Sequence, residues 1–283
     1  MWSEQTLELG SGRSLHLHQA GRGPDVLLIH GALTTSHDWR TSPVAAALAR
    51  SCRVTAIDRP GHGRSRRPRF EGTPRDQAAQ IAQGIERLGL QRPIVVGHSF
   101  GGLVSLALAE RHADSVGELI LLAPIAFPEP RTLEHSLLAP RAVPFAGPLF
   151  SRLAERTALD RTMLPLIHRL MFDPQPVPDH WRETYPFEKI LDPAALVFEG
   201  EDAAAILPLS AAGTIDLAAV TRPAHVLTGT ADRIVEDERQ AKRLARLLPE
   251  GRLTEIEGAG HMLHHTHSDP VLSAILEAVA PAA

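Results

Sequence analysis

A serine between two glycines is the first feature of this chain that could do chemistry. It lies in a glycine–x–serine–x–glycine pattern made of Gly97, His98, Ser99, Phe100 and Gly101. The pattern follows an apolar run at 94–96 and opens a helical pattern at 100–112. A sharp turn between a strand and a helix exposes a serine hydroxyl as a nucleophile, and it requires glycines because larger side chains would collide with both elements. We therefore predict that Ser99 is a nucleophile at the start of a helix.

A histidine and an aspartate complete this prediction, because a serine hydroxyl is a weak nucleophile without a base. Among 15 histidines, His261 is the best candidate for the base, since it follows the last strand-like run in a glycine-containing loop. Asp232 follows the preceding strand-like run and would fix the tautomer of the histidine and stabilise its charged form. The segment after the run 118–122 offers no competing carboxylate before Glu129. The order Ser99, Asp232, His261 thus predicts a catalytic triad.

Two backbone N–H groups are predicted to form an oxyanion hole, which stabilises the negative charge of a tetrahedral intermediate. One is the N–H of Phe100, the residue after the nucleophile. The other is assigned to Ala32, which follows an early apolar run at 26–29. His30 is interpreted as a structural donor that holds this loop, and His98 as a packing residue that points away from the substrate.

The elements that must position these residues alternate between strand-like and helical patterns. Apolar or alternating runs that favour strands occur at 15–18, 26–29, 53–57, 93–96, 118–122, 224–227 and 252–256. Helical patterns lie at 73–90, 100–112, 236–248 and 270–279. Strand, helix and strand in repetition predict an α/β fold with a mostly parallel, twisted, doubly wound sheet and helices on both faces.

A different kind of segment interrupts this alternation between residues 126 and 208. It contains 12 of the 23 prolines and 8 of the 12 Phe, Trp and Tyr residues, with helical patterns at 149–158 and 161–172 and no convincing strand. Helices inserted after a strand favour a cap over the carboxyl edge of the sheet, where open α/β sheets bind ligands. Their aromatic residues could also fill a small core of their own. We expect a core of residues 1–125 and 209–283 with a helical cap at 126–208.

Composition narrows the class of protein. The 283 residues carry 29 Lys and Arg against 33 Asp and Glu, a formal net charge of −4 without a basic stripe, so we expect no nucleic-acid or membrane partner. No apolar run of 18 residues and no signal-peptide core are found, and the single cysteine, Cys52, excludes a multi-cysteine metal site. We expect a cytoplasmic protein without a cofactor or a metal, and the oligomeric state is left open.

Five motifs together make the chain resemble the cap-bearing, esterase-like branch of the α/β-hydrolase superfamily. They are Leu28–Gly31, Asp58–Ser65, Gly97–Gly102, Gly229–Asp232 and Gly258–His261, in family order. The resemblance covers nearly the whole chain except the predicted cap, and it implies the α/β-hydrolase fold. It also implies a structural role for the loop Asp58–Ser65. Arg66, Arg67 and Arg69, which follow this loop, are interpreted as solvated charge.

Departures from the patterns of the subfamilies narrow the expected reaction. The branch includes esterases, C–C bond hydrolases, epoxide hydrolases, haloalkane dehalogenases and cofactor-free haloperoxidases. Dehalogenases and epoxide hydrolases have an aspartate where this chain has Ser99, and C–C hydrolases tend to have a tryptophan where it has Met262. We therefore predict a carboxylesterase-like serine hydrolase that acts on small to medium apolar esters through an acyl-enzyme on Ser99. The alternatives are C–C cleavage, lyase chemistry or perhydrolysis on the same triad, or a ligand-binding protein without catalysis.

The substrate pocket is predicted to be apolar and covered. Its expected lining comes from the oxyanion loop, the cap and the residue after the base: His30, Leu33, Phe145, Phe150, Phe172, Trp181 and Met262. Tyr185 and Phe187 are further aromatic residues of the predicted cap. His264, His265 and His267 lie close to His261 in the sequence. A metal-bound His261 could not act as a base, so we interpret these histidines as incidental and not as metal ligands.

Overall fold

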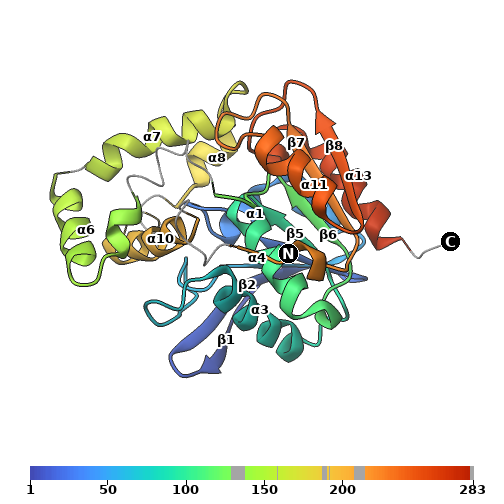
Figure 1. Cartoon of the computed structure of the whole chain (residues 1–283), viewed down its shortest axis with the longest axis horizontal. Coiled ribbons are helices and arrows are strands. Elements are labelled where there is room, and N and C mark those ends of the chain that lie inside the picture. Colours follow the sequence, from blue (N-terminus) through green and yellow to red (C-terminus); the bar gives the residue numbers. More distant parts are fainter. Residues whose placement is uncertain (129–137, 158, 187–189, 191, 207–213, 281–283) are drawn as a thin grey trace.

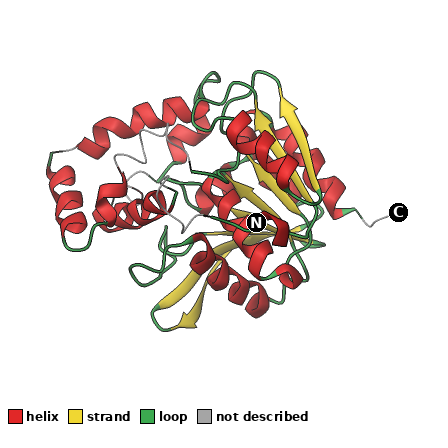
Figure 2. Cartoon of the chain, viewed as in Figure 1, coloured by secondary structure: helices red, strands yellow, loops and turns green. Residues whose placement is uncertain are grey.

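An eight-stranded sheet forms the centre of the protein (Figure 2). The computed structural model describes residues 1–128, 138–157, 159–186, 190, 192–206 and 214–280. The strands are β1 (Ser3–Gly10), β2 (Arg13–Ala20), β3 (Asp25–Ile29), β4 (Arg53–Ile57), β5 (Ile94–His98), β6 (Leu119–Leu122), β7 (Ala224–Gly229) and β8 (Gly251–Ile256). Their order across the sheet is β1-β2-β4-β3-β5-β6-β7-β8. The strands β3 to β8 run parallel and β2 is antiparallel to β1 and β4, which confirms the predicted mostly parallel sheet.

The parallel strands form because they are apolar on both faces. Along β3, Val26 and Leu28 belong to one apolar cluster, whereas Leu27 and Ile29 belong to another. Successive side chains of a strand point to opposite faces, so the two clusters lie on either side of the sheet. Helices α3 (Pro74–Leu88) and α4 (Phe100–Arg111) contribute to the cluster of Leu27, and α2 (Pro43–Leu48) and α13 (Ser268–Val279) to that of Val26. The predicted helices on both faces are confirmed.

Local signals set the ends of the helices that were predicted. Thr73 caps α3 together with Asp76 in a capping box, and Gly89 ends the helix at a φ of 61°. Helix α4 begins directly after Ser99, as the pattern at 100–112 predicts. These signals are short-range, which is why the sequence alone predicts them.

Several elements differ from the prediction. Strand β1 was not predicted, because most of its residues are exposed and it contains no apolar run. Helix α1 (Ser36–Thr41) is too short to show a period. The helix predicted at 236–248 instead begins as a π turn at Glu238–Lys242 and continues as α11 (Arg243–Leu247). In the π turn the buried side chain of Gln240 accepts hydrogen bonds from two backbone N–H groups after β6.

Helices also fill the described part of the chain between β6 and β7, which we call the inserted segment (138–206). They are a short turn at Ala139–Ala142, α6 (Ala146–Arg156), α7 (Leu159–Phe172), α8 (Asp179–Thr184) and α10 (Pro193–Ala205). In Figure 1, α6, α7 and α10 lie to one side of the sheet. Two of these helices match the predicted patterns, and the described residues of the segment form no strand. Further short turns lie at Ala113–Ser115 and Leu217–Ala219.

Among the described residues, no helix combines the length and the apolar character that crossing a membrane requires.

Candidate active site

Ser99 occupies a strained turn between β5 and α4. Its backbone has a φ of 53° and a ψ of −119°, a region that residues other than glycine rarely adopt and that costs about 1–3 kcal/mol. The strain persists because neighbours fix the turn: the Ser99 N–H donates to the Leu122 carbonyl over 2.9 Å, and the Ser99 carbonyl accepts from the Ile125 N–H over 3.2 Å. This is the geometry of a nucleophile elbow.

The two glycines of the motif are needed for the reason that the sequence suggests. A Cβ atom on Gly101 would overlap the carbonyl oxygens of Ile29 and His30, which belong to the neighbouring strand β3 and its exit. A Cβ atom on Gly97 would overlap the Ser105 hydroxyl and the Gly101 carbonyl in the first turns of α4. The close approach of helix and strand therefore depends on both glycines.

Asp232 and His261 form a buried pair at the ends of β7 and β8. His261 Nδ1 lies 2.7 Å from Asp232 Oδ2, and both side chains are at most 2% exposed. The other carboxylate oxygen, Oδ1, accepts from the N–H groups of Ile234 at 2.8 Å and Val235 at 3.0 Å. These bonds orient the carboxylate so that it accepts the Nδ1 proton, which makes Nε2 the basic nitrogen of the ring.

His98 links the elbow to the base. Its ring packs against the ring of His261 with centroids 4.7 Å apart, and its Nε2 lies 3.1 Å from the His261 carbonyl oxygen. Burial, with His264 and His261 nearby, lowers the pKa of His98 well below its ordinary value, so the ring is neutral and donates one hydrogen bond. Since His98 precedes Ser99, this contact brings the loop of His261 close to Ser99. The prediction of a packing residue was incomplete, because His98 also holds a backbone carbonyl.

The predicted oxyanion loop lies beside Ser99. A Cβ atom on Gly31 would be 3.1 Å from the Ser99 Cβ, so the Ala32 peptide is next to the serine. His30 is fully buried; it accepts from the Arg59 backbone N–H over 2.9 Å and donates to the Gly31 carbonyl over 2.8 Å. Burial and then Arg59 lower its pKa well below the ordinary value. Among the described residues, no hydrogen bond uses the N–H of Ala32 or of Phe100, which leaves both able to donate to a ligand.

Asp38 is a buried carboxylate that the sequence did not single out. Its two oxygens accept from Nε2 of His264 at 3.0 Å and of His265 at 2.6 Å. Both histidines belong to α12 (Leu263–Thr266), which starts two residues after His261. They keep the pKa of Asp38 well below its usual range, although burial alone would raise it. Two of the three histidines predicted to be incidental therefore anchor the segment that carries His261.

The predicted pocket residues fall into two groups. Those that are buried, at most 4% exposed, are His30, Leu33, Phe172, Trp181 and Met262. Phe172 and Trp181 pack edge to face, with ring centroids 5.3 Å apart. Phe145 is 96% exposed at the start of α6 and does not line an enclosed pocket, so its prediction was wrong. Phe150 is partly exposed and lies beside the Arg141 guanidinium, so its place in the pocket stays a prediction. Phe187 lies outside the described residues.

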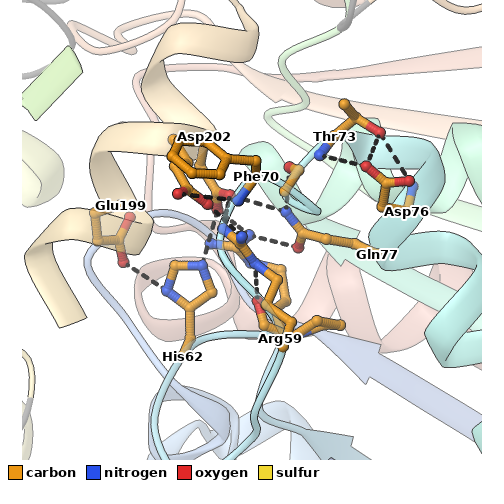
Figure 3. A network of polar contacts seen from close by, with 12 residues as sticks. Arg59, His62, Phe70, Thr73, Asp76, Gln77, Glu199 and Asp202 are labelled. Carbon is orange, nitrogen blue, oxygen red and sulfur yellow. Dashed lines mark hydrogen bonds and ion pairs between the residues drawn. The ribbon is translucent and has the colours of Figure 1, made fainter. Parts of the chain in front are cut away.

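A buried charge network joins the loop after β4 to α10 (Figure 3). It contains Arg59, His62, Arg67, Glu199, Glu201 and Asp202. Arg66 is exposed as predicted, but Arg67 is buried and pairs with Glu201 and Asp202, and the partly buried Arg69 pairs with Glu201. The interpretation of Arg67 and Arg69 as solvated charge was therefore wrong. A sequence does not show which distant residue a charged side chain pairs with, so no local signal could have revealed these ion pairs.

The loop Asp58–Ser65 has a structural role, as the resemblance implied. Asp58 Oδ1 accepts from the N–H and the hydroxyl of Ser36, and Oδ2 accepts from the Arg64 N–H over 2.8 Å. The carboxylate thus ties the turn after β4 to the start of α1.

Comparison with known proteins identifies the family of the chain. The family model described as alpha/beta hydrolase fold matches residues 24–268. The chain therefore belongs to the α/β-hydrolase family.

Individual relatives catalyse different reactions. Over 126 residues the chain is 37% identical to a 2-hydroxymuconate semialdehyde hydrolase of Pseudomonas sp. (strain CF600), covering 42% of this chain and only 44% of that relative. It is 27% identical over 266 residues to haloalkane dehalogenase 2 of Mycobacterium bovis, covering 93% of this chain and 90% of the relative. The solved structure of a thermophilic esterase from Thermogutta terrifontis is similar at a TM-score of 0.68 and 25% identity, over 97% of both chains.

Proposed function

We propose that the protein is a serine hydrolase that cleaves carboxylic esters of small to medium apolar substrates. The proposal is carried by the hydrogen bond from His261 to Asp232, together with the strained Ser99 at the end of β5. An aspartate–histidine pair beside an elbow serine is the arrangement that converts a hydroxyl into a nucleophile for acyl transfer.

In the proposed reaction, His261 Nε2 takes the proton of the Ser99 hydroxyl while Oγ attacks the ester carbonyl. The N–H groups of Ala32 and Phe100 donate to the oxyanion, and the tetrahedral intermediate expels the alcohol, which receives the proton from His261. Water, deprotonated by His261, then attacks the acyl-enzyme and releases the acid and the free serine. The reaction consumes one ester and one water and requires no cofactor.

The inserted segment is proposed to act as a cap over this site. The buried aromatic side chains of Phe172 and Trp181 support an apolar environment for the substrate. Helix α8 packs on α1, which follows the oxyanion loop, so the segment reaches the region of the site. The similarity to an esterase over almost the whole chain supports ester hydrolysis as the reaction.

A second candidate is hydrolysis of a C–C bond next to a ketone. It is favoured by the 37% identity to a 2-hydroxymuconate semialdehyde hydrolase over 126 residues. The same nucleophile, base and oxyanion hole would serve both reactions, so the substrate decides between them. The dehalogenase similarity does not extend to a nucleophilic aspartate, because this chain has Ser99 at the elbow.

The test is turnover of p-nitrophenyl esters from acetate to decanoate by the wild type and by Ser99→Ala, with 2-hydroxymuconate semialdehyde as a parallel substrate. We expect serine-dependent ester hydrolysis with a maximum at one chain length. Cleavage of the semialdehyde without ester turnover would replace the proposal by the second candidate. Turnover that survives in Ser99→Ala, or the absence of turnover on every substrate, would contradict both.

A further inference from the structure

Leu33 follows the predicted oxyanion donor Ala32, and the inserted segment holds its backbone from two sides. Its N–H donates to Glu199 Oε1 of α10 over 2.9 Å. Its carbonyl accepts from the hydroxyl of Tyr185, which directly follows α8. Burial and the neighbouring Glu199 raise the pKa of Tyr185 well above its ordinary value, so the hydroxyl keeps its proton and donates. Both contacts come from residues more than 150 positions away in the chain.

The conformation of Leu33 explains why such contacts matter. Its φ is 52°, in the left-handed region that a leucine rarely adopts. A strained backbone of this kind persists only where its surroundings fix it. The bonds from Glu199 and Tyr185 fix the peptide groups on both sides of the Leu33 Cα. One of them, the peptide between Ala32 and Leu33, adjoins the peptide that carries the Ala32 N–H.

The peptide that carries the Ala32 N–H is held through its other end. Its carbonyl is that of Gly31, and in a planar trans peptide the carbonyl fixes the direction of the N–H. The Gly31 carbonyl accepts from His30 Nδ1 at 2.8 Å, from the Thr34 hydroxyl at 3.2 Å and from Arg59 Nη2 at 3.2 Å. Arg59 in turn pairs with Asp202 of α10, and its guanidinium lies over the ring of Phe100.

Glu199 therefore holds the Ala32–Leu33 peptide directly, and Asp202 reaches the Gly31–Ala32 peptide through Arg59. The two carboxylates lie on one face of α10, because residues three apart on a helix are neighbours. His62 lies between the two carboxylates, with Nδ1 3.1 Å from Glu199 and Nε2 2.9 Å from Asp202 (Figure 3). Both carboxylates are buried, and a buried carboxylate is tolerated only when it is paired. Burial and Arg59 lower the pKa of His62, but Glu199 and Asp202 outweigh them and raise it overall.

We propose that Glu199, Asp202 and Tyr185 are positioning residues that set the oxyanion hole, so that docking of α10 on the loop after β3 is a condition for catalysis. The inference rests on the proposed function for its catalytic consequence. Its structural premise, that Glu199 holds the Leu33 peptide, is independent of that function. Opening of the inserted segment would then release the oxyanion loop.

The experiment compares three variants, two at Glu199 and one at Glu201, which lies on the same helix. Glu199→Leu removes the acceptor of the Leu33 N–H, and we expect kcat to fall by about 10²-fold with little change in KM, as for loss of an oxyanion donor. Glu199→Gln keeps an acceptor and should restore kcat to within about tenfold of the wild type. Glu201→Gln is the control: Glu201 belongs to the same charge network, through Arg67 and Arg69, but contacts neither Ala32 nor Leu33. Its kcat should fall by much less than that of Glu199→Leu.

Two further measurements keep the test decisive. Tyr185→Phe removes only a hydroxyl, which is compatible with folding, and should lower kcat by about three- to tenfold. Hydrogen exchange of the Leu33 amide reports on the loop without any substrate: it should accelerate in Glu199→Leu and stay as in the wild type in Glu201→Gln.

The outcomes separate this inference from the proposed function. If the wild type hydrolyses no ester, the proposed function fails, and the inference is then judged by Leu33 exchange and by the rate at which an aryl phosphonate modifies Ser99. Unchanged Leu33 exchange in Glu199→Leu overturns the inference whatever the catalytic result. Equal losses of kcat in Glu199→Leu and Glu201→Gln also overturn it, because they would show a general effect of helix docking.

Discussion

The two halves of the candidate site are held in different ways. The proposed triad is fixed inside the α/β core: Ser99, Asp232 and His261 each follow a parallel strand, and backbone hydrogen bonds complete the turns. The predicted oxyanion loop is also held from outside the core, by carboxylates of α10 that enter a buried charge network. On our proposal the second half depends on the inserted segment being in place, so the protein would keep the proposed triad and lose the oxyanion hole when that segment opens.

The largest effect is expected in the core half of the site. Replacement His261→Ala should lower kcat by about 10⁶-fold, because loss of the base removes activation of the serine. The circular dichroism spectrum and the unfolding midpoint in urea should stay close to those of the wild type. His267→Ala is the matched control from the same segment, and its kcat should be unchanged. A loss of activity of similar size in both variants would show that the segment and not the base is at fault.

A smaller loss is expected from Asp232→Asn. The amide oxygen can still accept from the N–H groups of Ile234 and Val235, but the amide no longer favours the tautomer with the proton on Nδ1. We expect kcat to fall by about 10⁴-fold with an intact fold. Steady-state kinetics with a p-nitrophenyl ester measures this, and a loss of less than about tenfold would speak against Asp232 as the acid of the triad.

Substitutions in the inserted segment should change the stability of the protein as well as its activity. Asp202→Ala removes the carboxylate partner of the buried Arg59 and one of the two buried carboxylate partners of His62 and of Arg67, and we expect the free energy of unfolding to fall by about 3–5 kcal/mol. Urea denaturation measures the change. Asp179→Ala in α8 removes an exposed pair with Arg182 and should cost less than about 1 kcal/mol. Similar losses in the two variants would refute the distinct role of the buried network.

A pH effect on the stability is expected from His168 in α7. Burial lowers the pKa of His168 from its ordinary 6.5 to about 4, although Asp38 opposes the shift. Between these two values the unfolded chain binds a proton that the folded chain does not, so stability falls as the pH drops from 6.5 towards 4, by up to about 3 kcal/mol. In His168→Phe this part of the pH dependence should vanish in urea titrations at several pH values. If the stability of His168→Phe depended on pH between 6.5 and 4 as strongly as that of the wild type, groups other than His168 would cause the effect.

The sequence predicts the core half of the site because its signals are local. Ser99 has its glycines beside it, and Asp232 and His261 each follow an apolar run closed by small residues. The strands of the parallel sheet are apolar on both faces, and the capped helix α3 carries its boundary signals at its ends. In each case the residues that cause the structure lie within a few positions of one another.

The remaining features depend on partners far apart in the chain. Asp38 is separated from the two histidines that it holds by 226 and 227 positions, and Leu33 from Glu199 by 166. Carboxylates on a helix predict an exposed face, whereas Glu199 and Asp202 are buried against cations of another loop. Phe145 shows the converse, since an aromatic residue that favours a pocket lies exposed. Such placements follow from tertiary packing, which no local pattern records.

The central claim is that Ser99 forms a covalent acyl-enzyme, and detection of this intermediate tests it most directly. The measurement is the mass of the protein, and then of its peptides, after acid quenching during turnover of a p-nitrophenyl ester. We predict that the wild type gains the mass of one acyl group on the peptide that contains Ser99, and that Ser99→Ala gains none. An acyl group on another residue, or continued turnover by Ser99→Ala, would contradict the assignment of Ser99 as the nucleophile.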